Sequence, residues 1–462
     1  MSDYAKIYRP IDGSVLREVL RDTVDGVDVI VRRAKDAQAG WGERTPEERG
    51  LVLLRIADAI DRRRPELAEV EAANIGRSVA AADRTLDFVV KSFRFFGGFA
   101  DKVYGQNIPL GPSLLTYTSR EPHGVVAAIV PWNAPIFFAA RKIAPAIAFG
   151  NSCVLKPAEE TPLSSLLLLE IMLEAGLPEG VVQVLNGGRD VGEALVKHPQ
   201  TDFVIFTGSD AGGRAVARTA ADTLTPVALE LGGKSPQIVF DDADLDAAVE
   251  PIAMGAYYEV GQACIAGSRL LVQEGVHDQL LERLKAFTES LLVGDPEKDG
   301  RRIGPQITRG QQQKTLQMVE DAERAGATRY AQAPMAAETQ NSQGYWVTPT
   351  VFSGVSTDME IWQEEVFGPV IATVPFSTEE DAIRLAHDTS FGLAAGVWTR
   401  DIGRGHRVAS KLDVGMAWVN NYALVDDQVP FGGVRRSGYG SEGGWAAVDT
   451  YTRVKTVWTQ IS

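Results

Sequence analysis

The sequence predicts an α/β fold in which two parallel sheets, each covered by helices, follow a helical N-terminal segment. Short apolar runs alternate with helix-like stretches from about residue 124 onward, in two successive series. Strands that alternate with helices indicate a mostly parallel sheet with helices on both faces. The chain has 462 residues, more than one hydrophobic core usually holds, so two or three lobes are expected.

The first hundred residues have the pattern of amphipathic helices. Apolar residues recur at helical spacing over 24–41, and a second apolar face runs over 51–60. Thr45, Pro46 and Glu48 lie between these stretches and are typical of a helix start. Thr45 can cap the helix, Pro46 suits its first turn, and Glu48 can reach back to the cap.

Two series of apolar runs form the predicted sheets. Helical patterns at 162–175, 211–221, 244–258, 277–292 and 379–387 separate the runs. The first series comprises 125–130, 153–155, 181–185, 203–206 and 227–229. The second comprises 238–240, 270–272, 370–374, 394–398 and 416–419. We interpret the two series as two α/β lobes.

Two further segments alternate apolar and polar residues and fit neither lobe. They are 114–120 and 449–458, and each has the pattern of a half-exposed strand. Exposed strands promote association unless they are paired. We therefore expect these segments to form an oligomerisation arm.

Composition excludes several classes of protein. Lys and Arg total 46 and Asp and Glu total 61, so the net charge of −15 argues against a general nucleic-acid binder. Two cysteines exclude a disulfide scaffold, and five scattered histidines show no metal-binding spacing, so no metal is expected. No signal peptide or apolar run of ~20 residues is visible, which predicts a cytoplasmic protein without a membrane partner.

Cys264 is the first candidate for chemistry. A lone cysteine is usually a buried structural thiol. Cys264, however, lies in a polar, glycine-flanked loop just before the apolar run 270–272, where a thiol can be accessible and a thiolate is a strong nucleophile. Cys153 lies inside an apolar run, and we expect it to be part of the core.

Two polar residues follow predicted strands. Glu230 closes the run 227–229 and precedes two glycines, so it is either a solvated strand end or a general base at the carboxyl end of a sheet. Asn133 follows the run 125–130 between Pro131 and Pro135. This loop is either a plain turn or a rigid support for a fixed amide donor.

Four more segments have the composition of ligand-binding loops. The segment 206–213 follows a strand and opens a helix, so its amides could meet a pyrophosphate, although it does not match G-x-G-x-x-G. The others are Lys156-Pro157-Ala158-Glu159, Glu365-Val366-Phe367-Gly368-Pro369 and Pro430-Phe431-Gly432-Gly433.

Taken together, these segments resemble the aldehyde dehydrogenase superfamily in its NAD(P)-dependent, hydrolytic branch. The motifs PWNAP, KPAE, FTGS, ELGGKSP, GQACIAGSR, EVFGP and PFGG occur in the family's order, and the match runs from about residue 10 to the C-terminus. The resemblance implies a Rossmann-like NAD-binding domain at 1–104 and 122–232 and an α/β catalytic domain at 233–436. It further implies bridging oligomerisation strands at 105–121 and 437–462 that build a homodimer or homotetramer.

The resemblance also implies the catalytic roles. Cys264 matches the nucleophile, which forms a thiohemiacetal with the aldehyde and then, after hydride transfer, a thioester. Asn133 matches the oxyanion-hole side chain. Glu230 matches the base that activates water to release the carboxylic acid.

For the cofactor, the resemblance points to NAD in preference to NADP. A carboxylate at Glu159 accepts hydrogen bonds from ribose hydroxyls and repels a 2′-phosphate, while Lys156 leaves use of NADP open. The matched cofactor positions are Trp132, Lys156, Glu159, Gly208, Ser209, Gly213, Leu231, Glu365 and Phe367.

Two substrate classes fit the sequence. Arg141 could hold a substrate carboxylate or hydroxyl through its planar fork, as in relatives that act on small semialdehydes, or it could pair with a local acid. Phe137, Phe138 and the PWNAP spelling resemble dehydrogenases of aromatic aldehydes, but the two rings could equally belong to the core on a helix face. Tyr422 could also reach the substrate tunnel.

Two alternative functions remain open at this stage. One is a CoA-acylating aldehyde dehydrogenase, which the presence of Glu230 disfavours. The other is a non-catalytic structural or binding protein on the same fold, which the complete set of Cys264, Glu230 and Asn133 disfavours.

Overall fold

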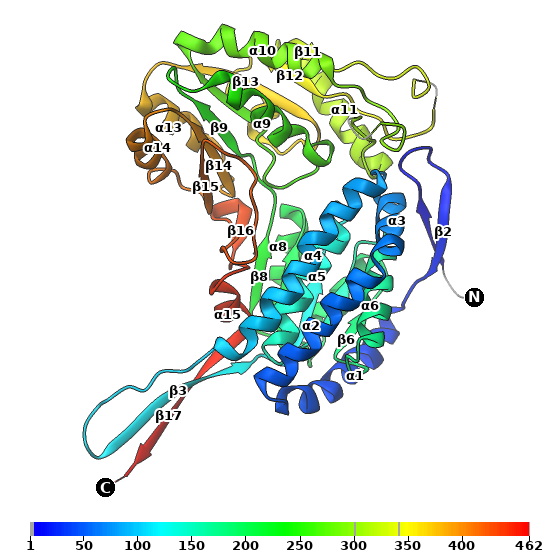
Figure 1. The fold of residues 1–462 in the computed structure, drawn as a ribbon, viewed down its shortest axis with the longest axis vertical. Helices are drawn as coiled ribbons and strands as arrows, with labels where there is room; N and C mark the ends of the chain where they lie inside the picture. The colour runs from blue at the N-terminus through cyan, green and yellow to red at the C-terminus, as the bar shows by residue number, and fades with distance from the viewer. Residues whose placement is uncertain (1–3, 300–301, 341, 462) are drawn as a thin grey trace.

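The computed structural model describes residues 4–299, 302–340 and 342–461, which form two α/β lobes and a projecting arm (Figure 1). Each lobe is built on one sheet, and the arm leaves the lower lobe as a two-stranded ribbon. This arrangement confirms the predicted fold class. Within the described residues, no helix is long and apolar enough to cross a membrane.

The lower lobe contains a six-stranded sheet in the order β16-β8-β7-β4-β5-β6. All neighbours run parallel except β16, which is antiparallel to β8. The strands are β4 (Val125–Ile129), β5 (Ser152–Lys156), β6 (Val182–Val184), β7 (Phe203–Thr207), β8 (Val227–Glu230) and β16 (Gly438–Tyr439). The strand order reverses between β4 and β7, and ligands bind outside the carboxyl ends of strands at such a reversal.

Helices cover both faces of this sheet. The four N-terminal helices belong to this lobe, as Figure 1 shows in blue. The helices are α1 (Val24–Glu43), α2 (Pro46–Arg62), α3 (Arg64–Ile75), α4 (Val79–Phe99), α5 (Pro135–Ala148), α6 (Leu163–Glu174), α7 (Arg189–Lys197), α8 (Asp210–Ala221) and α15 (Ala446–Tyr451). The predicted start of α2 is confirmed, because Thr45 and Glu48 form a reciprocal capping box.

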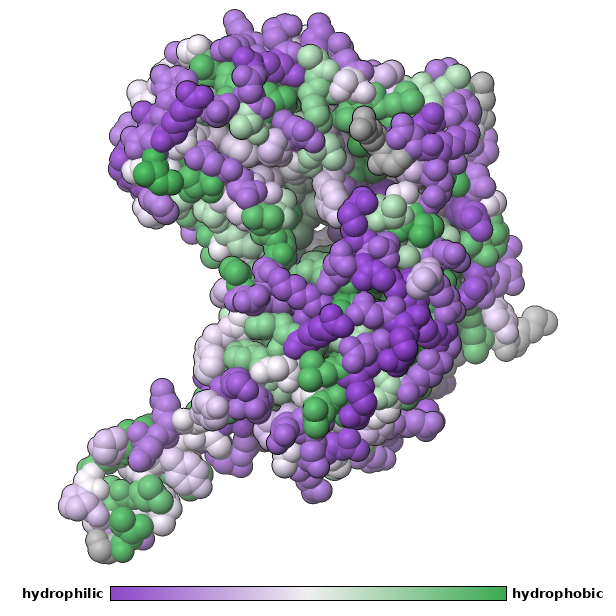
Figure 2. All heavy atoms as spheres, in the orientation of Figure 1, coloured by the Kyte–Doolittle hydropathy of each residue, from purple (hydrophilic) through white to green (hydrophobic). Residues whose placement is uncertain are grey.

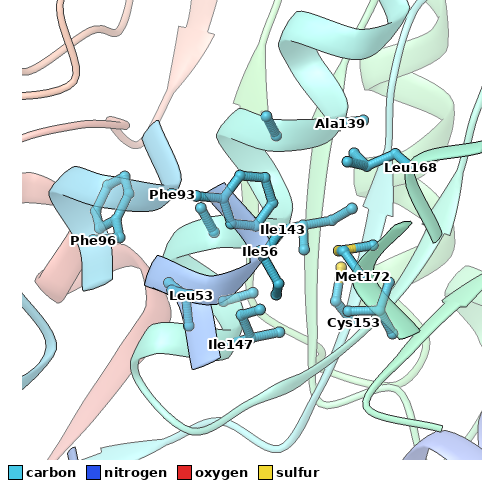
Figure 3. Close-up of a cluster of buried hydrophobic side chains, with 14 of the residues drawn as sticks. Leu53, Ile56, Phe93, Phe96, Ala139, Ile143, Ile147, Cys153, Leu168 and Met172 are labelled. Atoms are coloured by element: carbon cyan, nitrogen blue, oxygen red, sulfur yellow. The ribbon is translucent and has the colours of Figure 1, made fainter. Parts of the chain in front are cut away.

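The largest core of this lobe lies where α2, α4, α5 and α6 meet β5. Figure 3 shows Phe93, Ile143, Leu168 and Met172 pointing toward one another, with Cys153 beside them. Burial raises the pKa of the Cys153 thiol to about 12, so this thiol stays neutral. Cys153 is therefore a core residue, as predicted.

The upper lobe contains a seven-stranded sheet in the order β11-β12-β13-β10-β9-β14-β15. Only β11 runs antiparallel to its neighbour. The strands are β9 (Pro236–Val239), β10 (Arg269–Gln273), β11 (Thr328–Gln332), β12 (Thr350–Ser353), β13 (Val370–Phe376), β14 (Ala394–Trp398) and β15 (Met416–Val419). The helices are α9 (Leu245–Tyr257), α10 (His277–Ser290), α11 (Arg309–Arg324), α12 (Glu360–Gln363), α13 (Glu379–His387) and α14 (Ile402–Ala409).

The arm pairs β3 (Leu114–Pro122) with β17 (Thr452–Gln460) in an antiparallel ribbon. The segments 114–120 and 449–458, which fit neither predicted lobe, thus contribute strands that pair with each other, a pairing that the sequence did not predict. The segment 437–451, which the sequence assigned to the same arm, is not part of the ribbon. It contributes β16 to the six-stranded sheet, and Ala447, Val448 and Tyr451 lie in the main core because their apolar side chains pack under α5. The arm strand therefore begins only at Thr452.

An N-terminal hairpin was missed by the prediction. It consists of β1 (Tyr4–Tyr8) and β2 (Val15–Leu20), paired antiparallel, and lies at the right of Figure 1. In β1, buried Ala5 and Ile7 alternate with exposed residues over only five positions, and β2 has no buried residue. The period-2 pattern of the hairpin is therefore short and weak. The expectation that the first hundred residues are wholly helical was therefore wrong.

Candidate active site

A cavity of about 520 Å³ opens at the reversal point between β4 and β7. Loops that follow β4, β5, β6, β7 and β8 form most of it, and the upper lobe contributes the loops around Cys264 and Glu365. Such a volume lies within the range of about 300–1,000 Å³ that is usual for ligand sites. The predicted residues that line it are Trp132, Asn133, Lys156, Glu159, Gly208, Ser209, Leu231, Cys264, Glu365 and Phe367.

Cys264 lies on the loop between α9 and β10 and is partly buried. Burial, together with the nearby carboxylates of Glu365 and Glu230, raises the pKa of its thiol to about 12. The resting residue is therefore a neutral thiol, which must lose its proton before it can attack. Gly233 supports this loop, because a side chain there would come within 2.3 Å of the Cys264 carbonyl oxygen.

The backbone before Cys264 is held in an unusual conformation. Glu259, Val260 and Gly261 all have positive φ angles, of 51°, 56° and 68°, and the first two lack the freedom of glycine. The Glu259 carboxylate pairs with buried Arg77 at 2.6 Å. Gln262 is fully buried and bonds through its side chain to the Ile307 N–H and the Glu259 carbonyl. These contacts fix the strained turn that presents the thiol.

Asn133 is tied to the same turn. Its Nδ2 donates to the Gln262 carbonyl oxygen over 2.7 Å, and its side chain is almost fully buried. An amide nitrogen carries two hydrogens, so one N–H remains for a group in the cavity beside Cys264. Gln262 thus links the predicted oxyanion donor to the nucleophile loop, a connection that the sequence did not reveal.

Glu230 ends β8, level with Thr207 of β7. It is 3% exposed, and neither carboxylate oxygen has a hydrogen-bond partner among the described residues. Burial raises its pKa to about 8, and the positive charges of Lys142 and Arg141 limit the rise. Such a carboxylate can exchange a proton near neutral pH. Glu230 does not line the cavity itself but lies one residue before Leu231, which does.

The predicted pyrophosphate loop caps a helix. Ser209 is the N-cap of α8, and its Oγ accepts from the Gly212 N–H over 3.2 Å. Gly208 and Ser209 line the cavity, so the positive end of the helix dipole faces it. Gly213 lies one turn into α8 and does not line the cavity. A side chain there would collide with Leu231, so Gly213 allows close packing of helix and loop.

Glu365 and Phe367 form the wall contributed by the upper lobe. Glu365 Oε1 accepts from the Gly233 N–H over 2.9 Å, and burial raises the pKa of this carboxyl to about 7. The ring of Phe367 meets Trp132 edge-on with 5.3 Å between centroids. These contacts join the upper wall to the Asn133 loop.

The adenosine side of the cavity follows β5 and β6. Lys156 is buried, donates to the Pro157 carbonyl and packs its alkyl chain on Gly192 of α7. Glu159 forms an ion pair with Arg21. Gly187, Gly188 and Arg189 complete this side, and the prediction did not include them. The glycine pair after an apolar run and before a helix was the signal that could have identified them.

Of the residues considered for the substrate, Phe138 lines this cavity, whereas Arg141, Phe137 and Tyr422 lie outside it. Arg141 is buried and bonded to Glu442 and Asp427, at 2.9 and 3.1 Å, which is the structural role that the sequence left open. The ring of Phe137 packs on Phe88 with 4.2 Å between centroids. Tyr422 is buried, and its hydroxyl donates to the carbonyl of Ile265, the residue after Cys264.

Sequence comparisons assign the chain to a family of known proteins. Residues 2–457 match the aldehyde dehydrogenase family. An aldehyde dehydrogenase of Emericella nidulans is 41% identical, over 98% of this chain and 91% of the relative. A betaine aldehyde dehydrogenase of Rhizobium etli is 42% identical, over 97% and 92%.

Solved structures give the same result. The NAD+ complex of betaine aldehyde dehydrogenase from Staphylococcus aureus superposes with a TM-score of 0.97 at 35% identity, covering 100% of this chain and 92% of that one. The NAD+ complex of an aldehyde dehydrogenase from Bacillus cereus gives 0.96 at 39% identity, covering 100% and 94%. The chain therefore belongs to the aldehyde dehydrogenase family and is an oxidoreductase.

Proposed function

We propose that the protein oxidises an aldehyde to the carboxylic acid with NAD as the acceptor, through a thioester on Cys264. The observation that carries this proposal is the meeting of Cys264 and Asn133 in one cavity, with the buried carboxylate of Glu230 behind it. The cavity also suits a dinucleotide, because it offers a helix N-terminus for phosphate and a carboxylate for ribose hydroxyls. When bound there, NAD accepts the hydride.

In the first half of the reaction, the Cys264 thiol gives its proton to solvent water in the cavity, and the thiolate sulfur forms a bond to the aldehyde carbon. The carbonyl π electrons move to oxygen, and the free N–H of Asn133 and the Cys264 backbone N–H stabilise the resulting oxyanion. As the oxyanion collapses, the hydride leaves the carbon and a thioester remains on Cys264. The fixed turn around Gln262 holds both donors in place.

In the second half, water attacks the thioester carbon and the Cys264 thiolate leaves. Glu230 takes a proton from the attacking water, so it must be ionised at the start of this step. Its pKa of about 8 places that ionisation close to neutral pH. Splitting oxidation and hydrolysis into two covalent steps is the advantage of the nucleophile.

For the substrate, we favour an aromatic or similarly apolar aldehyde over a small carboxylated one. Arg141 is buried outside the cavity, where Nη1 and Nε bind Asp427 and Glu442. The rings of Phe88, Phe137 and Phe431 lie within 6 Å of its guanidinium carbon. An arginine that is neutralised by two carboxylates and enclosed by aromatic rings is poorly placed to bind a substrate carboxylate in the cavity.

The test compares NADH formation from benzaldehyde, succinic semialdehyde and betaine aldehyde at equal concentration. Betaine aldehyde is included because relatives of the chain carry that name. Preference for benzaldehyde is expected. Preference for the semialdehyde would make Arg141 a carboxylate clamp, and inertness toward all aldehydes despite NAD binding would support a non-catalytic protein. A product that appears only when CoA is added would indicate the acylating branch.

We also propose that the chain forms a cytoplasmic homo-oligomer through its arm. Figure 2 shows apolar side chains gathered on the arm, where Leu115, Tyr117, Val454 and Trp458 are exposed. An exposed apolar ribbon needs a covering partner. Light scattering should show a dimer or tetramer, and a monomer would contradict this assignment.

A further inference from the structure

The turn that presents the Cys264 thiol is anchored by a residue from a distant part of the chain. Arg77 lies in the turn between α3 and α4, and its Nε donates to the Glu259 carboxylate over 2.6 Å, across 182 positions of sequence. The two side chains are only 8% and 15% exposed. The pair is therefore largely shielded from water, and each charge depends on the other for compensation.

Arg77 also joins this turn to a third segment. Its Nη1 donates to the Pro305 carbonyl over 3.0 Å, and the Ile307 N–H donates to Gln262 Oε1 over 3.0 Å. The backbone N–H and the Nε2 of Gln262 both donate to the Glu259 carbonyl. The same two segments are thus connected at two points, once by Arg77 and once by Gln262.

The conformation of the turn explains why it needs an anchor. Glu259 and Val260 have φ angles of 51° and 56°, in the left-handed region that residues other than glycine adopt only when surrounding contacts impose it. Gly261 continues the turn with a φ of 68°, and a side chain there would collide with the Gly368 carbonyl. Valine has no polar side-chain atom, so the carboxylate of Glu259 is the group through which an ion pair can hold these strained residues.

The shape of this turn determines where the proposed oxyanion donors lie. The Gln262 carbonyl accepts from Asn133 Nδ2 over 2.7 Å, and Cys264 follows two residues later. The Asn133 loop also contacts α3, since the Ile136 N–H lies 3.4 Å from Glu71 Oε1. A relaxed turn would therefore move the sulfur and the Cys264 N–H relative to the Asn133 amide.

We propose that Arg77 is a positioning residue for the reaction of Cys264, because it acts through Glu259 to hold the turn in the shape that aligns the sulfur with the oxyanion donors. The inference deepens the proposed function and rests on it for the roles of Cys264 and Asn133. Arg77 does not line the cavity of about 520 Å³. Binding of the aldehyde and of NAD should therefore depend little on it.

The test measures the first-turnover rate of NADH formation from benzaldehyde in Arg77→Met, which removes the charge and keeps a long side chain. The rate should fall ~10–100-fold, because a displacement of about 1 Å at a reacting atom can cost ~10²-fold. The KM of the aldehyde and the Kd of NAD should change less than about threefold, since neither ligand touches Arg77. Arg77→Lys keeps the charge and should restore most of the rate.

Arg49→Met is the matched control. Arg49 is as buried as Arg77, at 8% against 9% exposure, but its guanidinium bonds to the backbone carbonyls of Ala148 and Arg44 outside the cavity. This variant should lose stability in urea and keep the wild-type first-turnover rate. A rate in Arg77→Met that is as fast as in Arg49→Met would overturn the proposal.

A double-mutant cycle tests whether Arg77 acts through Glu259. Glu259→Gln should also slow the first turnover, and the double variant Arg77→Met/Glu259→Gln should be no slower than the slower single variant, because both changes break the same pair. Losses that multiply in the double variant would contradict the proposed route. If Arg77→Met does not fold, Glu259→Gln decides the question, and a wild-type rate in that variant would refute the proposal.

Hydrogen exchange of the full chain separates this inference from the proposed function, because it needs no aldehyde. Exchange of the amides in 259–264 should be about tenfold faster in Arg77→Met and unchanged in Arg49→Met, since opening of the turn breaks the bond from the Gln262 N–H to the Glu259 carbonyl. Unchanged exchange in Arg77→Met would overturn the inference. Failure of the proposed function would look different, because exchange would rise in the variant although the wild type oxidised no aldehyde.

Discussion

The two ends of the cavity place their carboxylates in opposite environments. At the catalytic end, Glu230 is buried, and neither of its oxygens bonds to any residue that the structure describes. At the adenosine end, Glu159 is partly exposed and paired with Arg21. An unsatisfied buried carboxylate costs stability but can exchange its proton near neutral pH, whereas a paired, partly exposed carboxylate contributes to binding through its hydrogen bonds. Substitutions at the catalytic end should therefore change rates by orders of magnitude, and those at the adenosine end should change affinity modestly.

The largest effect is expected for Cys264→Ala. Without sulfur no thioester forms, so NADH production should fall by ~10⁴-fold or more while NAD still binds. Stopped-flow absorbance with benzaldehyde measures the loss. Cys153→Ala is the matched control and should keep full activity, with unfolding made easier by about 1 kcal/mol because a core atom is lost. Full activity in Cys264→Ala would disprove the covalent mechanism.

Glu230→Gln should reduce steady-state turnover by ~10²–10⁴-fold, because the amide cannot accept a proton from water. A first-turnover burst of NADH should persist, since thioester formation precedes the step that needs Glu230. In the wild type, hydrolysis should accelerate as pH rises through about 8, the pKa of Glu230, because only the ionised form is a base. A wild-type rate that shows no rise in this range, or a variant that retains it, would assign the base elsewhere.

The same substitution should make the protein more stable in alkaline buffer. The pKa of Glu230 is raised on folding, so the native state binds more protons than the unfolded state from about pH 4.5 to about 8. Stability associated with this group therefore falls as pH rises across that window. Urea unfolding at pH 6 and pH 9 should show a smaller decline for Glu230→Gln than for the wild type. Equal declines would mean that Glu230 is satisfied in solution.

Asn133→Ala should lower kcat by ~10²–10³-fold, which is typical for loss of one oxyanion donor. Asn151→Ala is the structural counterpart, because Asn151 Nδ2 donates to the carbonyls of Ala146 and Tyr451 far from the cavity. It should lose about 1–3 kcal/mol of stability and keep its kcat. Comparing kcat and urea midpoints for both variants separates a donor to the oxyanion from a donor to the scaffold.

The sequence predicted the elements that have a clear apolar pattern and missed those that form only through pairing. Runs of apolar residues identified ten strands of the two sheets, and α13 has the bounds that its pattern predicted. The short, more polar β11 and β12 and the hairpin β1–β2 were missed, because their pairing depends on partners rather than on composition.

For the site, loops with a distinctive composition were predictable, and contacts between distant residues were not. Cys264, Asn133 and Glu365 follow from local motifs and do meet in one cavity. Gln262 was missed because its role depends on its backbone carbonyl, which accepts from Asn133. Arg21 was missed because nothing near it in the chain points to Glu159. The partners of Arg141, Asp427 and Glu442, were missed for the same reason, since both lie far from Arg141 in the sequence.

The smallest effect is expected for Glu159→Gln, and it tests the adenosine end directly. The neutral amide still hydrogen-bonds a ribose hydroxyl, but less strongly than a carboxylate, so the Kd of NAD should rise about tenfold with little change in kcat. Unfolding free energy should change by less than about 1 kcal/mol, because the ion pair with Arg21 is partly exposed. Glu174→Gln breaks a comparable exposed pair with Arg63 and should leave the Kd of NAD unchanged. Fluorescence titration with NAD measures the affinities. A large fall in kcat with an unchanged Kd would show that Glu159 acts on the reacting end of the dinucleotide, and the division of the cavity into a catalytic end and a binding end would then be wrong.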